Sequence, residues 1–216
     1  MPIRNYTIID RIITQFDRSL QATLGHVSAA RPNPADAIAD NPHTDMSEKQ
    51  RRHSAALMRI NHCGEICAQA LYDAQGLRSK NPKVRQLLQD AGKEEIDHLA
   101  WTHQRLQELN SHRSYLGLAW YWSSFLIGYL AAGRGDALSL GFVEETEHQV
   151  GAHLAGHVKQ LQGVDPKSVS IIEAMQADEA KHAHSAHQEG AQTLGPITKT
   201  FMRLQAKVMT TLTYWL

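Results

Sequence analysis

Two pairs of a glutamate and a histidine, each three residues apart, are the feature of the sequence that most directly indicates chemistry. They are Glu95 with His98, and Glu179 with His182. Residues three apart on an α-helix lie on one face, so each pair would present a carboxylate and an imidazole to a single point. These groups are ligands for transition metals. The repeat therefore indicates a metal site between two helices.

A single glutamate lies about thirty residues before each pair, at Glu65 and at Glu147. The chain thus reads as two similar helical hairpins that each contribute three ligands. This is the ligand set of four-helix bundles that bind two iron or two manganese ions. Four buried carboxylates would be costly alone, and two divalent ions would neutralise them. We therefore predict a two-metal site with the ligands Glu65, Glu95, His98, Glu147, Glu179 and His182.

The apolar pattern separates these residues from chance matches, because Glu-x-x-His occurs a third time at Glu145 and His148. The helical period places Glu147 at the centre of an apolar stripe and Glu145 nearly opposite it. The third match is therefore interpreted as fortuitous. Glu65 lies at the edge of its stripe, and Glu144, one turn before Glu147, remains an alternative ligand. A purely structural polar core is the alternative to the metal site as a whole.

Composition narrows the class of protein further. The 216 residues suffice for one domain with a substantial core, and the 22 basic and 22 acidic residues give no nucleic-acid footprint. Cys63 and Cys67 are interpreted as small thiols on a helix, with a zinc site that includes His62 as the alternative. Residues 1–20 lack the continuous apolar core of a signal peptide. A reducing cytoplasmic compartment is expected.

Apolar periodicity and helix caps predict an all-α chain in two parts. Residues 1–46 are expected to be an N-terminal arm, with an amphipathic helix over 3–24 and then a mobile linker. Residues 47–216 open with a capping box at Ser47 and Gln50. This part is predicted to be a ferritin-like four-helix bundle with a crossover helix and an amphipathic C-terminal helix.

Two segments have the composition of an apolar surface. Residues 115–132 are eighteen residues without a charge, which borders on the length of a membrane span. Their glycines, serines and aromatic residues favour an interface over the bilayer interior, so we predict a crossover helix that touches a membrane or an apolar ligand. Residues 197–216 place apolar side chains on one side and basic ones around the other. This is typical of an interfacial helix, with a plain packing helix as the alternative.

Four motifs of the sequence are specific when taken together: Asn61-His-Cys-Gly-Glu65, Glu95-Ile-Asp-His-Leu99, Val143-Glu-Glu-Thr-Glu147 and Asp178-Glu-Ala-Lys-His182. They resemble the demethoxyubiquinone hydroxylase family of ubiquinone biosynthesis, in its bacterial form. The resemblance covers about residues 50–216, and Cys63 stands where the family has alanine.

What this resemblance implies is a di-iron monooxygenase that hydroxylates the ring of a polyprenylated demethoxyubiquinol with O2. Two iron ions per chain, ferrous in the oxygen-reactive state, are implied as cofactors, with an external reductant for which NADH is a candidate. One iron would be held by Glu65 and His98 and the other by Glu147 and His182. Glu95 and Glu179 would bridge them.

The resemblance also implies a place in the cell. The protein would lie on the cytoplasmic face of the bacterial inner membrane as a peripheral protein, because its substrate has a polyprenyl tail. A homo-oligomer or an accessory lipid-binding protein are further partners left open. The rival functions are a ferritin-like protein that oxidises and stores iron, and a helical lipid-binding module without enzymatic activity.

Overall fold

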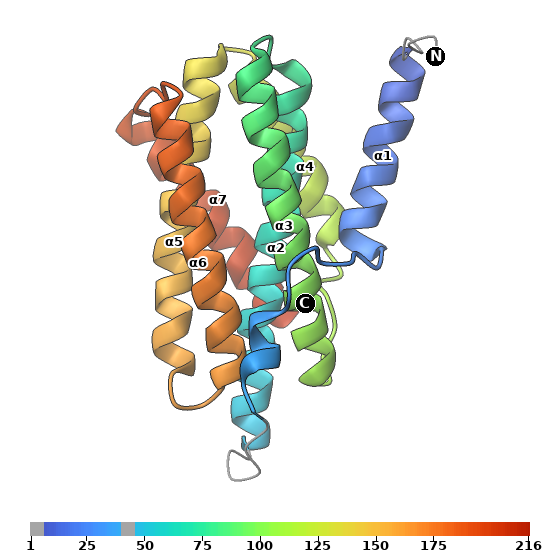
Figure 1. Cartoon of the computed structure of the whole chain (residues 1–216), viewed down its shortest axis with the longest axis vertical. Coiled ribbons are helices and arrows are strands. Elements are labelled where there is room, and N and C mark those ends of the chain that lie inside the picture. The colour runs from blue at the N-terminus through green and yellow to red at the C-terminus, as the bar shows by residue number, and fades with distance from the viewer. Residues whose placement is uncertain (1–6, 40–45) are drawn as a thin grey trace.

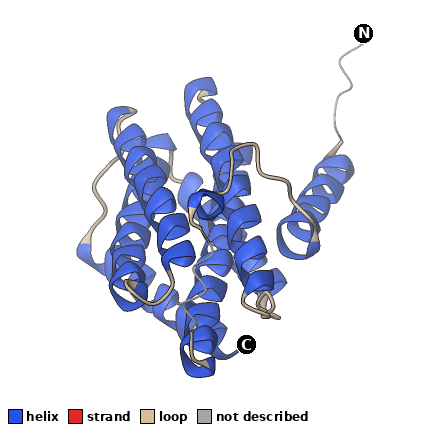
Figure 2. Cartoon of the chain, turned by 60° about the horizontal axis from the view of Figure 1, so that its bottom comes forward, coloured by secondary structure: helices blue, strands red, loops and turns tan. Residues whose placement is uncertain are grey.

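A bundle of four long helices forms the body of the protein. The computed structural model describes residues 7–39 and 46–216, and within these ranges it contains seven α-helices, one short 3-10 helix and no strand (Figure 1, Figure 2). The all-α prediction is confirmed. The bundle helices are α2 (Glu48–Arg78), α3 (Pro82–Glu108), α5 (Asp136–Leu161) and α6 (Pro166–Gln188).

Local signals set the starts of three of these helices. The Ser47 side chain accepts a hydrogen bond from the Gln50 amide, and the Gln50 side chain accepts one from the Ser47 amide, so the predicted capping box opens α2. Asn81 and Asp165 cap α3 and α6, and a proline follows each at the first helical position. Turns of a few residues therefore join α2 to α3 and α5 to α6 as two antiparallel hairpins.

A buried ion pair joins the two hairpins at one end of the bundle. The Arg105 guanidinium of α3 donates to Asp165 Oδ1 at 2.7 Å and to Ser168 Oγ at 3.0 Å. Asp165 also accepts from the Ser168 amide at 3.0 Å and from the Ser54 hydroxyl of α2. Both charged side chains are almost completely buried. The capping residue of α6 is thus also the group that attaches α6 to α2 and α3.

Helix α4 (Gly117–Ala132) is the predicted crossover and covers the outer side of α2. At Gly128 the two backbones approach so closely that an added Cβ would lie 3.0 Å from the carbonyl oxygen of Leu71. In the described part of the chain, no helix combines the length and apolar character that crossing a bilayer requires.

Helix α1 (Ile8–Leu24) faces the bundle with its polar side. Gln15, Ser19 and Thr23 are buried, and Arg18 forms an ion pair with Asp73 of α2. The described apolar side chains of its other face are exposed, namely Ile9, Ile12, Ile13, Phe16 and Leu24. Residues 3–6 of the predicted helix lie outside the described residues. The apolar stripe that predicted an arm helix is therefore available to something outside this chain.

Helix α7 (Pro196–Trp215) also exposes an apolar stripe. Met202 and Thr213 are buried against the bundle, and the Arg59 guanidinium donates to the Tyr214 carbonyl at 3.1 Å. The exposed apolar side chains are Ile197, Phe201, Leu204, Val208, Leu212 and Trp215. The apolar and basic pattern of the sequence is thus realised with the apolar side outward.

The segment after α1 does not behave as the mobile linker predicted for residues 26–46. Its described part runs over α3 and α6 (Figure 1) and contains a 3-10 helix, η1 (Pro34–Ala37), with Ala35 buried in the main core cluster. We call residues 26–38 the strap. The prediction was wrong because polar and backbone contacts, which have no periodicity, hold this segment. Residues 40–45 lie outside the described residues.

Candidate metal centre

The four bundle helices bring the six predicted ligands together in two groups. In each group, one ligand atom from every residue lies within 4.8 Å of the others, and all members are buried. Glu95 and Glu179 belong to both groups and therefore lie between them. The first group adds Glu65 and His98 to these two, and the second adds Glu147 and His182.

Each histidine directs one ring nitrogen toward the glutamates of the cage and the other toward a carboxylate outside the cage. His98 Nδ1 lies 2.8 Å from Glu95 Oε2 and 3.4 Å from Glu65 Oε2. On the opposite side of the ring, His98 Nε2–H donates to Asp178 Oδ2 at 3.0 Å. An acceptor at one nitrogen of a ligating histidine fixes the tautomer and the ring orientation for the metal at the other nitrogen. His98 is therefore oriented for binding through Nδ1.

His182 has the same arrangement with the roles of the hairpins exchanged. Its Nδ1 lies 3.4 Å from Glu95 Oε1 and 3.4 Å from Glu179 Oε2, and its Nε2 lies 3.4 Å from Glu94 Oε2. The outer carboxylate in each half directly precedes a shared glutamate, since Glu94 precedes Glu95 and Asp178 precedes Glu179. Each hairpin thus supplies the carboxylate beside the other hairpin's histidine.

Several buried polar atoms that face the cage have no partner with hydrogen-bond geometry among the described residues. They are Glu95 Oε1, Glu179 Oε2 and Nδ1 of His182. Buried polar groups are normally satisfied, and each exception calls for an explanation such as an ion. A pair of divalent cations would satisfy these atoms and balance the carboxylate charge, so the donor set fits two metal ions of the carboxylate and imidazole class.

Because the cage carboxylates lie close together, their pKa values differ, so that some are protonated and others are ionised. Burial, together with the charge of Glu95, raises the pKa of Glu65 well above its ordinary value, and burial with the charge of Glu179 does the same for the pKa of Glu147. Burial and Glu95 raise the pKa of Glu179 to about 7. Burial opposes the charge of Glu95 too, but the His98 charge and hydrogen bonds lower its pKa. The metal-free cage therefore holds protons that cations would displace.

The two histidines complete this balance. Burial disfavours a charged His98, but the charge of Glu95 and the hydrogen bond to Asp178 outweigh it and raise the pKa well above 6.5. For His182, burial is likewise outweighed by the carboxylates of Glu179 and Glu95, each 3.4 Å from its Nδ1, which raise the pKa to about 11. In the metal-free cage, protonated imidazoles thus supply the positive charge that metal ions would supply when bound.

The neighbouring acidic residues on α5 lie outside the cage. Glu144 lies 3.0 Å from His187 Nδ1, and Glu145 forms an ion pair with Lys199 of α7 at 2.5 Å. Glu147 is buried, and its Oε1 accepts a hydrogen bond from the hydroxyl of Tyr72. Among these three glutamates, the structure therefore gathers only Glu147 with the other proposed ligands.

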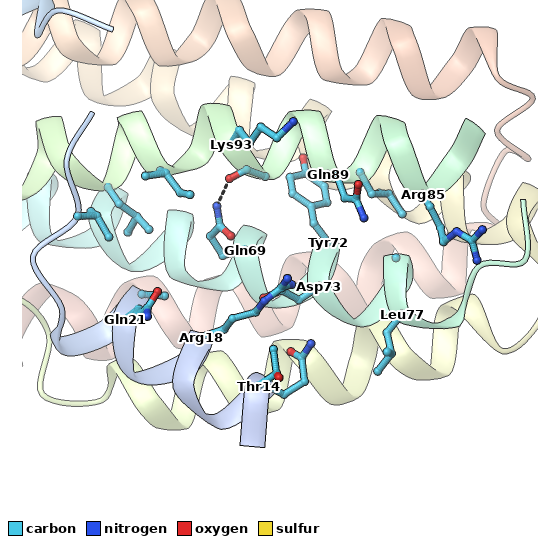
Figure 3. Close-up of a pocket in the computed structure, with 18 residues that line it drawn as sticks. Thr14, Arg18, Gln21, Gln69, Tyr72, Asp73, Leu77, Arg85, Gln89 and Lys93 are labelled. Atoms are coloured by element: carbon cyan, nitrogen blue, oxygen red, sulfur yellow. Dashed lines mark hydrogen bonds and ion pairs between the residues drawn. The ribbon is translucent and has the colours of Figure 1, made fainter. Parts of the chain in front are cut away.

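A cleft lies on the outer side of α2 and α3 beneath α1. It has a volume of about 970 Å³ and is lined by both apolar and polar side chains, the polar ones including Arg18, Gln69 and Asp73 (Figure 3). Tyr72 also lines the cleft, and its ring meets His182 edge-on at a centroid distance of 6.4 Å. Because the Tyr72 hydroxyl bonds Glu147, this side chain forms the wall between the cleft and the cage.

Comparisons with known proteins identify the family. Residues 52–213 match the model of the family described as ubiquinone biosynthesis protein COQ7. The chain belongs to the COQ7 family. It is 51% identical over 207 residues, 96% of this chain and 98% of the relative, to the 3-demethoxyubiquinol 3-hydroxylase of Janthinobacterium sp. (strain Marseille). It is 50% identical over 213 residues, 99% of this chain and 98% of the relative, to that of Coxiella burnetii (strain RSA 493 / Nine Mile phase I).

Three residues of this COQ7-family chain that adjoin the cage were not singled out from the sequence. Glu94 and Asp178 carried a usable signal, because an acidic residue directly precedes the first glutamate of both Glu-x-x-His pairs. Tyr72 lies seven residues after Glu65, two turns along the same helix, but its contact with Glu147 depends on how the hairpins pack.

Proposed function

We propose that this protein hydroxylates the ring of a polyprenylated demethoxyubiquinol in ubiquinone biosynthesis, as a di-iron monooxygenase that uses O2. The observation that carries the proposal is the pair of donor groups that share Glu95 and Glu179. Relatives that match nearly the whole chain at about half identity are named as 3-demethoxyubiquinol 3-hydroxylases. Electrons would come from an external reductant, for which NADH is the candidate.

The six cage residues would hold the iron ions. Glu65 and His98 would bind one ion, Glu147 and His182 would bind the other, and Glu95 and Glu179 would bridge the pair. Bound iron would supply the activation of O2, which no side chain of the protein can perform. The chain's part is to exclude water and to hold the ligands in place. The cage residues are all buried, and the Tyr72 hydroxyl fixes one oxygen of Glu147.

The exposed apolar side chains of α1, α4 and α7 support a peripheral position on a membrane; those of α4 are Trp122, Leu126, Tyr129 and Leu130. Buried polar residues attach α1 to the bundle while Ile9, Ile12 and Ile13 are exposed, so packing within the chain does not explain these three isoleucines. Contiguous exposed apolar surface marks a membrane or protein contact. A quinol with a polyprenyl tail resides in the bilayer, so these faces would bring the cage to the substrate. We place the protein on the cytoplasmic side of the inner membrane.

The test is iron stoichiometry followed by turnover. Protein reconstituted anaerobically is expected to hold two iron ions per chain, and the Glu95→Ala and Glu179→Ala variants are expected to lose most of this iron. Glu144→Ala is the control and should keep both iron ions, since Glu144 is one turn before the proposed ligand Glu147 but pairs with His187 outside the cage. With O2 and reductant, the loaded protein should convert a short-tailed demethoxyubiquinol analogue to a product one oxygen atom heavier.

Each failure has a distinct meaning. Correctly folded protein that binds no iron would overturn the di-iron assignment. Protein that binds iron and consumes O2 but leaves the quinol unchanged would overturn the hydroxylase assignment, and iron accumulated in large particles would then indicate an iron-storing protein.

A further inference from the structure

The strap places a cation from the N-terminal segment beside the proposed metal centre. Ala35 of the strap is buried, and the Asn33 side chain donates to Gln104 Oε1 of α3 at 3.0 Å. The Ala30 amide donates to Asp97 Oδ1 at 2.6 Å. The strap is therefore attached to α3 both before and after Arg31. The region that matches the family model begins at residue 52, so the strap lies outside it.

Arg31 contacts two carboxylates, one of which also bonds a proposed ligand. Its Nε donates to Asp97 Oδ2 at 2.6 Å and its Nη1 lies 2.8 Å from Asp178 Oδ2. That same oxygen of Asp178 accepts the hydrogen bond from His98 Nε2–H at 3.0 Å. The guanidinium also lies over the ring of Trp101, with Cζ 4.8 Å from the centroid. A continuous chain of contacts thus runs from the strap through Asp178 to His98.

Among the residues that the structure describes, none forms such a clamp at the equivalent position in the other half of the cage. Glu94, the outer carboxylate beside His182, is paired with Lys181, whose side chain is 61% exposed. An exposed lysine pair holds geometry weakly, because the side chain is flexible and water competes for its charge. The planar guanidinium of Arg31, by contrast, bridges two carboxylates that are 4% and 14% exposed. The two outer carboxylates therefore differ in how firmly they are fixed.

We propose that Arg31 is a positioning residue for the metal centre. It holds Asp178 in the orientation that accepts from His98 Nε2–H, and Asp178 in turn keeps His98 Nδ1 directed at the cage. The proposal rests on the proposed function, since it assigns Arg31 to the half of the two-metal site that contains His98. It also makes the strap a structural part of that half.

The test is metal affinity of the metal-free protein rather than turnover. Cobalt(II) is titrated anaerobically against a competing chelator, and its visible absorption bands report each binding event. A His98→Ala variant identifies which event belongs to the His98 half. Loss of an outer contact to a metal ligand typically weakens binding about tenfold to a hundredfold. Arg31→Ala is expected to weaken the His98 event by about tenfold and the other event by less than about threefold.

Two further variants separate positioning from general stability. Lys181→Ala is the matched control and should change either event by less than about threefold, because Lys181 is exposed. Arg31→Lys keeps the charge but can contact only one of the two carboxylates, so it should recover part of the lost affinity. Thermal melting of each metal-free variant monitors the fold.

The outcomes are distinct. An unchanged His98 event in Arg31→Ala would overturn the proposal. So would equal weakening of both events together with a lower melting temperature, because that result would mean a general loss of structure. Wild-type protein that binds no cobalt would instead overturn the two-metal site itself.

Discussion

The ion pair between Arg105 and Asp165 gives a quantitative test of what holds the two hairpins together. Replacing Asp165 with asparagine keeps the size of the side chain and an oxygen that can cap α6, but removes the negative charge. Arg105 would then be left almost completely buried without its buried partner, and only the more exposed Glu108 would still pair with it. Asp165→Ala would in addition remove the cap on the Ser168 amide.

The expected loss follows from burial. Removing one partner of a buried ion pair costs about 3–5 kcal/mol, because the remaining charge stays buried without that partner. Arg105 keeps its pair with Glu108, which places the expected cost at the lower end of this range. We expect a loss of about 3 kcal/mol for Asp165→Asn and, with the cap gone, about 4 kcal/mol for Asp165→Ala. In a domain of this size each kcal/mol lowers the melting temperature by about 2–4 °C, so Asp165→Ala should melt about 8–16 °C lower.

The assay is urea unfolding of the metal-free protein followed by circular dichroism. Glu108→Gln is the control, because Glu108 pairs with the same arginine at 2.6 Å but is 31% exposed and one helical turn away. It should cost less than about 0.5 kcal/mol. The reasoning is refuted if Asp165→Asn loses less than about 1 kcal/mol, or if the two substitutions cost the same.

Two further predictions concern stability against acid and membrane binding. Burial, with the charges of Arg113 and His103, lowers the pKa of His62 to about 3 from 6.5. Below pH 6.5 the unfolded chain binds a proton that folded His62 does not, so this contribution is complete above pH 6.5 and is lost as the pH falls toward 3, by up to about 1.4 kcal/mol per pH unit. His62→Gln should therefore reduce the decrease in the free energy of unfolding between pH 7.5 and 5.5. The control His112→Gln, at an exposed position, should show the same decrease as the wild type. An equal decrease in His62→Gln and wild type would contradict the prediction. Wild-type protein should float with phosphatidylethanolamine and phosphatidylglycerol vesicles, and the pair Phe201→Asp and Leu204→Asp should reduce the floated fraction at least about fivefold. The control is the double variant Thr200→Asp and Arg203→Asp, which adds at least as much negative charge on the same helix. If the control lowers the floated fraction as much as Phe201→Asp with Leu204→Asp does, the apolar face is not the cause of membrane binding.

The clustering of these residues could be predicted because the helical period alone puts Glu95 and His98, or Glu179 and His182, on one face. The position of Glu147 at the centre of an apolar stripe also separates it from Glu145, which pairs with Lys199 outside the cage. These inferences need only the geometry of one helix. That the six residues bind iron stays a prediction, as does the division of the chain at residue 46.

The sequence was less informative where contacts are polar and lie between elements. The strap has no periodicity, and nothing local indicates that Arg31 meets Asp97 and Asp178, which are more than sixty residues away. Helix α1 was predicted from its apolar stripe, yet the face that attaches it to the bundle contains Gln15, Ser19 and Thr23. Periodicity tells that a helix has two faces, but the tertiary structure decides which of them is buried.

The crossed arrangement of the outer carboxylates makes the two hairpins depend on each other for a complete cage. Glu94 of the first hairpin lies beside His182 of the second, and Asp178 of the second accepts from His98 of the first. A single hairpin would lack the carboxylate for its own imidazole, but two identical hairpins related by a twofold axis would supply one another. Half of the cage cannot be transplanted into another scaffold as one hairpin.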